Sequence, residues 1–381
     1  MPETNVESIY LNIIFSIKAL SNQGGGAERV LLDVASGLVR RGHTITIISN
    51  DPEGQASYYP MNDAIQRISL DIGNVAGKSS LDDVLRRIIR FRRTIARIRP
   101  DVVVAFMHST YLPMGGALIG TGIPMIASEH ISPEHYQNRW LERILLQLTP
   151  LIAAKITVVT NQILLSFGWW LRRSMTVVPN PVSGAKRKRP DKLDAGLGHR
   201  RILLSVGRLA PQKNQQCLIA AFAQVLIKFP NWKLRIVGEG ELREALEAQV
   251  LDLGLSDSVE LPGAVLDVSQ EYGRADLFVL PSTYESFGLA TAEALLHGLP
   301  VVGFADCPGT NTLIRNNENG ILVNGANRID ALATALIDLM ADPKELQRLA
   351  SASTEWLESQ FDINSVLDCW EELIEEVVGK R

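Results

Sequence analysis

Short apolar runs alternate with amphipathic helical patterns along this 381-residue sequence. In the first half, these runs are Leu11–Ile17, Thr44–Ser49, Ile65–Leu70, Val102–Phe106, Pro124–Ser128, Ile156–Val159 and Thr176–Val178. In the second half, they are Ile202–Val206, Leu234–Val237, Val259–Leu261, Leu277–Leu280, Val301–Val302 and Ile321–Val323. Strands covered by helices on both faces carry such continuous apolar runs, and the intervening helices connect parallel neighbours. The alternation therefore predicts an α/β protein with two doubly wound parallel sheets, one in each half.

The two halves meet at a stretch with the composition of a linker. Residues 179–199 contain Asn180-Pro181, the basic run Lys186-Arg187-Lys188-Arg189 and a glycine-containing tail. Proline, glycine and like charges in succession are typical of a connection between domains. We predict a first domain over residues 1–182 and a second over residues 183–355. The last segment, 356–381, is a helical pattern without a strand of its own, and we expect it to pack back across the domain interface.

Composition argues against several classes of protein. Lys and Arg number 38 and Asp and Glu 42, so the formal net charge of −4 argues against a nucleic-acid partner. The three cysteines lack zinc-site or disulfide spacing, which fits a reducing cytosol. No Asp-x-Asp occurs, and we expect neither a metal nor a cofactor. The N-terminus lacks the basic region of a signal peptide, and no stretch reaches the ~20 clean apolar residues of a membrane span. We expect a cytoplasmic protein that is soluble or peripheral at the inner face of the cytoplasmic membrane.

Two cations flank the loop that follows the first strand of the second half. Arg208 and Lys213 lie in the string Ser205-Val206-Gly207-Arg208-Leu209-Ala210-Pro211-Gln212-Lys213-Asn214, which leads into a helix. Cations beside the free amides of a helix start suit a diphosphate. Each residue taken alone is equally compatible with a solvated loop charge.

A second strand-to-helix turn carries two carboxylates. Glu285-Ser286-Phe287-Gly288-Leu289 follows the run Leu277–Leu280, and Glu293 lies further into the predicted helix. Amides of residues 286–289 at the helix start are suited to phosphate oxygens. Glu293 is predicted to accept hydrogen bonds from ribose hydroxyls, and Glu285 to lie near a transferred sugar. A surface helix charge is the alternative for Glu293, but its apolar neighbours indicate a carboxylate that needs a partner.

Three weaker signals lie at other strand ends. Gly25 and Gly26 open a helix and permit a sharp turn toward an anion. Gly238 and Glu239 follow a strand of the second half, where glycine lets the backbone approach a flat base. His130 follows the run Pro124–Ser128, a place that favours a functional over a structural histidine. A plain turn is the alternative interpretation of both glycine motifs.

These motifs together resemble those of the family 4 retaining glycosyltransferases, over about residues 10–375. They occur in the family's order: Gly25-Gly26-Ala27-Glu28-Arg29, Ser128-Glu129-His130, Pro179-Asn180-Pro181, Gly207-Arg208 with Lys213, Gly238-Glu239-Gly240, and Glu285 with Glu293. The resemblance implies the GT-B architecture, in which two Rossmann-like domains face a central cleft. The first domain would bind the acceptor and the second the nucleotide-sugar donor.

The resemblance also implies roles for individual residues. Arg208 and Lys213 would bind the donor diphosphate, and Glu293 the ribose. Glu285 would contact the transferred sugar together with the amides of Ser286, Phe287, Gly288 and Leu289, which also reach the phosphate. His130 would face that sugar from the other domain, and Gly25 and Gly26 would approach the phosphates.

One predicted helix of the first half carries a basic stripe. Within Leu81–Arg99, apolar residues recur at helical spacing at Val84, Ile88, Phe91, Ile95 and Ile98. A second stripe consists of Arg86, Arg90, Arg93 and Arg97, joined by Arg87, Arg92 and Arg99. A solvated basic face is the plain interpretation. The functional hypothesis adds that the arginines meet anionic lipid or a lipid diphosphate, together with the aromatic and basic cluster Trp169-Trp170-Leu171-Arg172-Arg173.

We therefore expect transfer of a hexose or N-acetylhexosamine from a nucleotide diphosphate sugar, UDP-linked, to a glycan acceptor on a polyprenyl diphosphate. By resemblance, the enzyme retains anomeric configuration and is similar to bacterial enzymes of lipid-linked oligosaccharide, O-antigen and exopolysaccharide assembly. Two alternatives stay open on the sequence. One is a UDP-sugar epimerase on the same fold, and the other a non-catalytic nucleotide-sugar binding protein.

Overall fold

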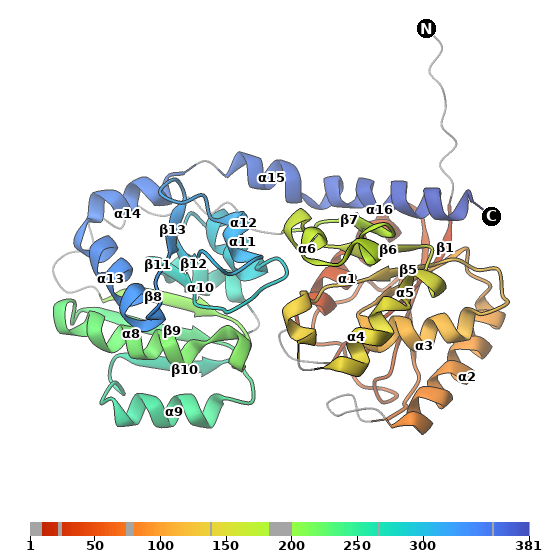
Figure 1. The fold of residues 1–381 in the computed structure, drawn as a ribbon, viewed down its shortest axis with the longest axis horizontal. Coiled ribbons are helices and arrows are strands. Elements are labelled where there is room, and N and C mark those ends of the chain that lie inside the picture. Colours follow the sequence, from red (N-terminus) through yellow and green to blue (C-terminus); the bar gives the residue numbers. More distant parts are fainter. Residues whose placement is uncertain are drawn as a thin grey trace, which may run out of the picture. The chain divides into compact units, whose positions relative to one another are not determined.

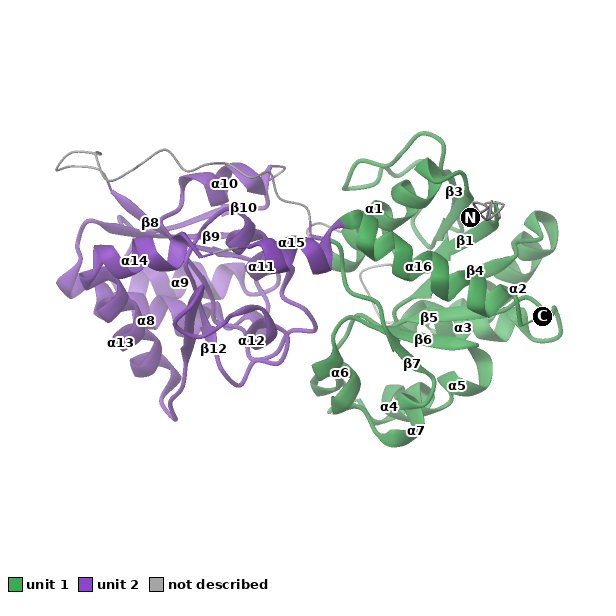
Figure 2. Ribbon diagram, turned by 90° about the horizontal axis from the view of Figure 1, so that it is seen from above, with its two compact units in different colours: residues 1–22, 26–181, 363–381 green, residues 23–25, 182–362 purple. Residues whose placement is uncertain are grey.

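The chain folds into two compact units in this computed structural model (Figure 2). The structure describes residues 10–21, 25–73, 80–137, 139–182, 200–265, 267–352 and 354–380. The first unit comprises residues 1–22, 26–181 and 363–381, and the second residues 23–25 and 182–362. The basic run at 186–189 lies outside the described residues.

A seven-stranded parallel sheet forms the centre of the first unit, in the order β3-β2-β1-β4-β5-β6-β7 (Figure 1). Its strands are β1 (Asn12–Ser16), β2 (Thr44–Ser49), β3 (Gln66–Ser69), β4 (Val102–Phe106), β5 (Met125–Ser128), β6 (Lys155–Val158) and β7 (Met175–Val177). Every residue of β4 and β5 is buried, as expected for strands covered on both faces. Strand order steps outward in both directions from β1 and β4, which is the doubly wound arrangement.

Helices of the first unit pack against this sheet. They are α1 (Gly26–Arg40), α2 (Leu81–Ile98), α3 (His108–Leu118), the 3-10 helix η1 (Pro133–Tyr136), α4 (Trp140–Gln147), α5 (Thr149–Ile152), α6 (Asn161–Ser166), α7 (Trp169–Arg172) and α16 (Ile363–Val378). A capping box starts α2: the Ser80 side chain accepts from the Asp83 amide, and the Asp83 carboxylate accepts from the Ser80 amide.

The last helix of the chain, α16, packs on the first unit. Its Trp370 is 2% exposed and stacks on Phe106, with ring centroids 6.2 Å apart, and meets Phe15 edge-on at 6.5 Å. Gly37 of α1 allows close contact with this helix, because a Cβ there would lie 2.5 Å from a Leu367 methyl carbon. α16 is thus part of the core of the first unit.

The helical pattern predicted as one C-terminal helix is two helices in the structure. α15 (Glu355–Phe361) ends at Asp362, whose ψ of 142° is extended, and α16 begins at the next residue. An extended residue breaks the series of i to i−4 hydrogen bonds, so the helix axis cannot continue through it. α15 belongs to the second unit and α16 to the first.

A six-stranded parallel sheet forms the centre of the second unit, in the order β10-β9-β8-β11-β12-β13. Its strands are β8 (Arg201–Val206), β9 (Trp232–Val237), β10 (Val259–Gly263), β11 (Leu277–Leu280), β12 (Val301–Phe304) and β13 (Gly320–Val323). Two parallel, helix-covered sheets confirm the predicted α/β class.

Helices of the second unit include α8 (Gln215–Lys228) and α13 (Arg328–Ala341), which pack against each other beside the sheet (Figure 1). The others are the 3-10 helix η3 (Pro211–Lys213), α9 (Arg243–Asp252), α10 (Val268–Arg274), α11 (Leu289–Leu296), α12 (Thr310–Leu313), α14 (Pro343–Ala350) and α15. Because β8, β9 and β11 are parallel neighbours, the loops at their carboxyl ends lie along one edge of the sheet. None of the helices in the described part of the chain has the length and apolar character needed to cross a bilayer.

Candidate active site

The loop after β8 carries the two basic residues predicted to bind the diphosphate, and they differ in exposure. Arg208 is exposed, whereas Lys213 ends η3 and is partly buried, with a side chain that is 19% exposed. Asn214 follows in the left-handed conformation, with φ of 53°, and starts α8. Gln215 fixes the loop, since its side-chain amide donates to the Arg208 carbonyl at 2.9 Å.

Lys213 and Glu285 form a partly buried ion pair. Lys213 Nζ lies 2.5 Å from Glu285 Oε1, and Glu285 is only 7% exposed. The same carboxylate oxygen accepts the Ser282 hydroxyl at 2.6 Å. The sequence places both charged residues at the carboxyl edge, but it predicts neither their pairing nor Ser282. The sequence signal for the contact with Ser282 was a serine three residues before a glutamate in the loop that follows a strand.

The turn between Glu285 and α11 presents free backbone amides. Gly288 has φ of +87° and precedes the first residue of α11. In the described part of the chain, no acceptor faces the amides of residues 286–290, whereas the next two amides bond to the Gly288 carbonyl. Gly309 supports this turn, since its amide donates to the Glu285 carbonyl at 3.0 Å and a Cβ there would lie 2.7 Å from the Phe287 nitrogen. Gly309 was not predicted from the sequence, although Pro308-Gly309 is a turn signal.

Glu293 lies in the second turn of α11 and is 7% exposed. Its Oε2 accepts the Tyr272 hydroxyl at 2.9 Å, which supplies the partner that an acidic side chain among apolar neighbours requires. His297 in turn contacts the Glu293 carbonyl through Nδ1 at 2.8 Å. The burial excludes the alternative of a solvated helix charge, and Tyr272 is a further residue that the sequence analysis missed.

The glycines after β9 bring two loops into contact. Gly238 has φ of +146°, and a Cβ there would lie 2.1 Å from the Gly207 carbonyl oxygen. A Cβ on Gly240 would similarly lie 2.3 Å from the Leu209 carbonyl oxygen. Glu239 forms a bidentate pair with Arg243, at 2.6 and 2.8 Å, and this pairing lowers its pKa. The loops after β8 and β9 therefore support each other at the same edge of the sheet.

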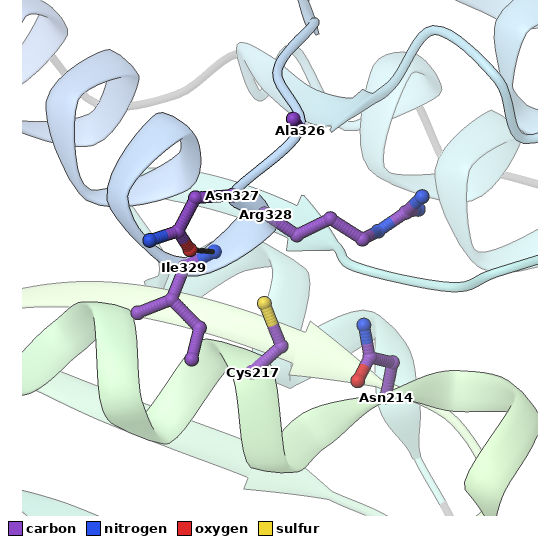
Figure 3. A pocket seen from close by; sticks show the side chains of 6 residues that line it. All are labelled: Asn214, Cys217, Ala326, Asn327, Arg328 and Ile329. Carbon is purple, nitrogen blue, oxygen red and sulfur yellow. Dashed lines mark hydrogen bonds between the residues drawn. The ribbon is translucent and has the colours of Figure 1, made fainter.

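A hollow beside Asn214 extends this edge (Figure 3). Asn214 and Cys217 at the start of α8 face Ala326, Asn327, Arg328 and Ile329 at the start of α13. The Arg328 guanidinium lies over the Phe304 ring, 3.8 Å from its centroid, and pairs with Asp306 at 2.7 Å. The hollow thus adjoins the loop that carries Lys213.

In the first unit, His130 directly follows Glu129 at the end of β5. Its ring stacks on Phe106, with centroids 4.8 Å apart and an interplanar angle of 14°, and its Nε2 contacts Ser128 Oγ at 2.9 Å. Partial burial of the ring lowers the pKa of His130 to about 4, so the imidazole is neutral near pH 7. Gly26 is the first residue of α1, and Gly25 precedes it.

The four arginines Arg86, Arg90, Arg93 and Arg97 are all exposed along α2, and Phe91 and Ile95 of the apolar stripe are buried. The sequence pattern predicts that Arg87 joins the exposed stripe, and this prediction is wrong. Arg87 is 1% exposed, and its Nη2 donates to the Ile72 carbonyl at 3.0 Å. This position faces the core, where the Ile72 carbonyl accepts a hydrogen bond from Nη2.

Solved structures with the same architecture include a sucrose-phosphate synthase from Thermosynechococcus elongatus, with a TM-score of 0.82 and 19% identity over 97% of this chain and 100% of that one. Anabaena HepE in complex with UDP-glucose gives a TM-score of 0.79 and 21% identity over 96% of this chain and 100% of that one. The fold is therefore that of the GT-B enzymes, as the resemblance implies.

Sequence comparisons identify the family. The model "Glycosyltransferase Family 4" matches residues 24–184, and the model "Glycosyl transferases group 1" matches residues 191–356. An uncharacterized glycosyltransferase of Haemophilus influenzae is 26% identical over 92% of this chain and 96% of its own length. A Campylobacter jejuni enzyme, named as the GalNAc-alpha-(1->4)-GalNAc-alpha-(1->3)-diNAcBac-PP-undecaprenol alpha-1,4-N-acetyl-D-galactosaminyltransferase, is 26% identical over 96% of this chain and 99% of its own length. The chain is a glycosyltransferase and belongs to the family 4-like enzymes of the GT-B fold.

Proposed function

We propose that this glycosyltransferase moves a hexose or N-acetylhexosamine from a UDP-sugar to a glycan acceptor on a polyprenyl diphosphate, with retention of anomeric configuration. The observation that carries the proposal is the edge of the second sheet. There, Lys213 lies against Glu285, and the five amides of residues 286–290 lack acceptors among the described residues. The solved complex of HepE with UDP-glucose and the undecaprenol-linked acceptor in the name of the Campylobacter relative support the choice of donor and acceptor.

The proposed chemistry follows from where charge develops. Cleavage of the bond between the anomeric carbon and the donor phosphate leaves negative charge on the departing diphosphate. Arg208, Lys213 and the amides of residues 286–290 stabilise that charge more in the transition state than in the ground state. These groups supply the positive charge without a metal or cofactor, and a donor phosphate oxygen takes the proton of the acceptor hydroxyl. We assign the ribose to Glu293, the base to the Gly238–Glu239 loop, and contact with the transferred sugar to Glu285 and to neutral His130.

Donor binding tests this assignment. Glu293→Gln keeps the acceptor for the Tyr272 hydroxyl but removes the charge, and hydrogen bonds to charged groups contribute about 1.5–3 kcal/mol. We expect UDP affinity, measured by isothermal titration calorimetry, to fall about 10- to 100-fold. Glu244→Gln, an exposed carboxylate on α9, is the matched control and should bind UDP normally. Unchanged affinity in Glu293→Gln would remove Glu293 from the donor site. Product analysis with and without a glycan acceptor separates transfer from epimerisation.

We further propose that the first unit docks on an anionic membrane surface. Large apolar residues are exposed on neighbouring helices, and Trp170 Nε1 ties α7 to α4 by donating to the Gln147 carbonyl at 3.0 Å. This α4–α7 surface consists of Trp140, Leu141, Ile144, Leu148, Leu151, Leu165, Trp169 and Trp170. Exposed tryptophans beside arginines are typical of the membrane–water interface. The arginine stripe of α2 would add attraction to anionic lipid or to the acceptor diphosphate.

Vesicle binding tests the membrane proposal. In Trp140→Gln/Trp169→Gln, sedimentation with vesicles containing phosphatidylglycerol should fall at least about tenfold, because burial of one large apolar side chain contributes about 1.5–3 kcal/mol. Ile227→Gln/Leu251→Gln, which alters two exposed apolar residues of the second unit, should bind normally. Arg86→Gln/Arg90→Gln/Arg93→Gln/Arg97→Gln should lose the salt-sensitive part of binding. Equal binding by all variants at low salt would refute the proposal.

A further inference from the structure

A buried carboxylate that the proposed reaction does not use precedes His130. Glu129 is 1% exposed and accepts three hydrogen bonds from different elements. Tyr111 of α3 donates its hydroxyl to Oε2 at 2.6 Å, and Tyr136 of η1 lies 3.0 Å from the same oxygen. The Ile131 amide donates to Oε1 at 2.9 Å. Glu129 therefore fastens both sides of the His130 loop to α3.

The hydrogen-bonded chain continues to the surface. Tyr136 Oη lies 2.9 Å from His108 Nδ1, and His108 Nε2 lies 3.3 Å from Glu142 Oε2. The Glu142 side chain is 33% exposed and pairs with Arg139 at 3.2 Å. We call Glu129, Tyr111, Tyr136, His108 and Glu142 the Glu129 network.

Proton positions in the Glu129 network are coupled. The contact with Glu142 favours a proton on His108 Nε2. A neutral His108 then accepts the Tyr136 hydroxyl at Nδ1, so a protonated Glu129 donates to Tyr136 Oη. In the ionised form of Glu129, the Tyr136 hydroxyl turns to donate to the carboxylate. A neutral His108 must then carry its single proton on Nδ1, donate it to Tyr136, and give up the hydrogen bond from Nε2 to Glu142. Charge on Glu129 thus decides the direction of every bond as far as His108.

Burial places this change near neutral pH. Desolvation raises the pKa of Glu129 to about 7, although the hydroxyls of Tyr111 and Tyr136 and the backbone amides of Ile131 and His130 oppose the shift. Desolvation also lowers the pKa of His108 to about 4, with His135, Arg139 and Lys18 acting in the same direction and Glu142 against it. A neutral His108 and a titrating Glu129 are the states that the geometry accommodates.

We propose that Glu129 is a positioning residue for His130, that its ionised form holds the His130 loop in the competent geometry, and that Tyr136 and His108 link its protonation to Glu142 at the surface. The inference rests on the proposed role of His130 in sugar transfer. Hydrogen bonds to a charged acceptor are about twice as strong as neutral ones, so ionisation tightens the loop.

The pH profile of kcat tests the proposal. In the wild-type enzyme, kcat should rise about fivefold through pH 7, which corresponds to about 1 kcal/mol of added positioning. Glu129→Gln should stay at the low-pH value at every pH, with an unchanged KM for the donor. Tyr136→Phe removes a donor to the carboxylate and should move the midpoint of this rise in kcat, which we call the step, to higher pH. Glu142→Gln removes a nearby negative charge and should move it to lower pH.

Controls separate positioning from simple loss of structure. Tyr58→Phe alters a tyrosine of the same unit outside the Glu129 network and should leave the step in place. A merely structural role would lower kcat at all pH values without moving the step. The proposal is overturned if Glu129→Gln keeps the step, or if neither Tyr136→Phe nor Glu142→Gln shifts it.

A readout without activity keeps this inference apart from the proposed function. The folded pKa of Glu129 lies above its unfolded value of about 4.5. The protonated carboxyl therefore contributes stability to the folded state that is fully present below pH 4.5 and is lost as the pH rises to about 7. The wild-type Tm should therefore fall between pH 5 and about 7.5 relative to that of Glu129→Gln. Parallel Tm curves would refute the titration of Glu129 even if transferase activity were found. A pH-dependent difference in Tm between wild type and Glu129→Gln, without any sugar transfer from UDP-sugars, would support the titration of Glu129 and refute the proposed function.

Discussion

Replacement of Lys213 by methionine should lower kcat/KM by about 100- to 1,000-fold, the usual effect of removing one preorganised donor from a developing negative charge. Methionine keeps the length and apolar contacts of the side chain, so the change removes mainly the ammonium group. Steady-state release of UDP measures the result. Most of the loss should fall on kcat, because the charge on the departing diphosphate grows as the glycosidic bond breaks.

The ion pair with Glu285 complicates this experiment and calls for a matched control. Loss of Lys213 also leaves Glu285 buried without its cation, which can cost stability. Lys233→Met breaks a pair of the same chemistry in the same unit, with Glu260 at 2.6 Å, and should leave kcat/KM within about twofold of wild type. If Lys213→Met kept most of its kcat/KM, the cationic donor site proposed at this edge of the sheet would be wrong.

Replacement of Trp370 by alanine should produce the largest loss of stability, about 3–5 kcal/mol in the first unit. The indole is 2% exposed and lies against Phe106 and Phe15, so its removal opens a cavity between α16 and the sheet. For a unit of this size, the corresponding transition in differential scanning calorimetry should fall by roughly 10 °C. The two units unfold as separate bodies in this expectation, so the transition of the second unit should stay in place.

Trp169→Ala is the control for the removal of an indole, because Trp169 is 64% exposed and leaves no cavity. Its transition should move by less than about 2 °C. Trp370→Phe should lie between the two variants, since it keeps an aromatic ring against Phe106. A Trp370→Ala protein as stable as wild type would mean that α16 contributes little to the first unit.

Local features of the sequence were sufficient to predict the class of fold and which strand-to-helix segments lie at the carboxyl edge of the second sheet. Continuous apolar runs between helical patterns predict buried parallel strands, because each strand of such a sheet is covered on both faces. Parallel strands also end at a common edge, so the strand-to-helix segments that carry Arg208, Lys213, Glu285 and Glu293 were expected there. This reasoning needs only the order of residues along the chain.

Contacts between residues far apart in the chain were decided by the tertiary structure alone. Lys213 meets Glu285 across 72 residues, and Tyr272 finds Glu293 across 21. Arg87 is turned inward among exposed arginines, and Trp370 completes the core of a unit that begins more than 300 residues earlier. The physical reason is that burial and pairing depend on which elements pack together in space, and a periodic pattern gives the face of a helix without naming what covers it.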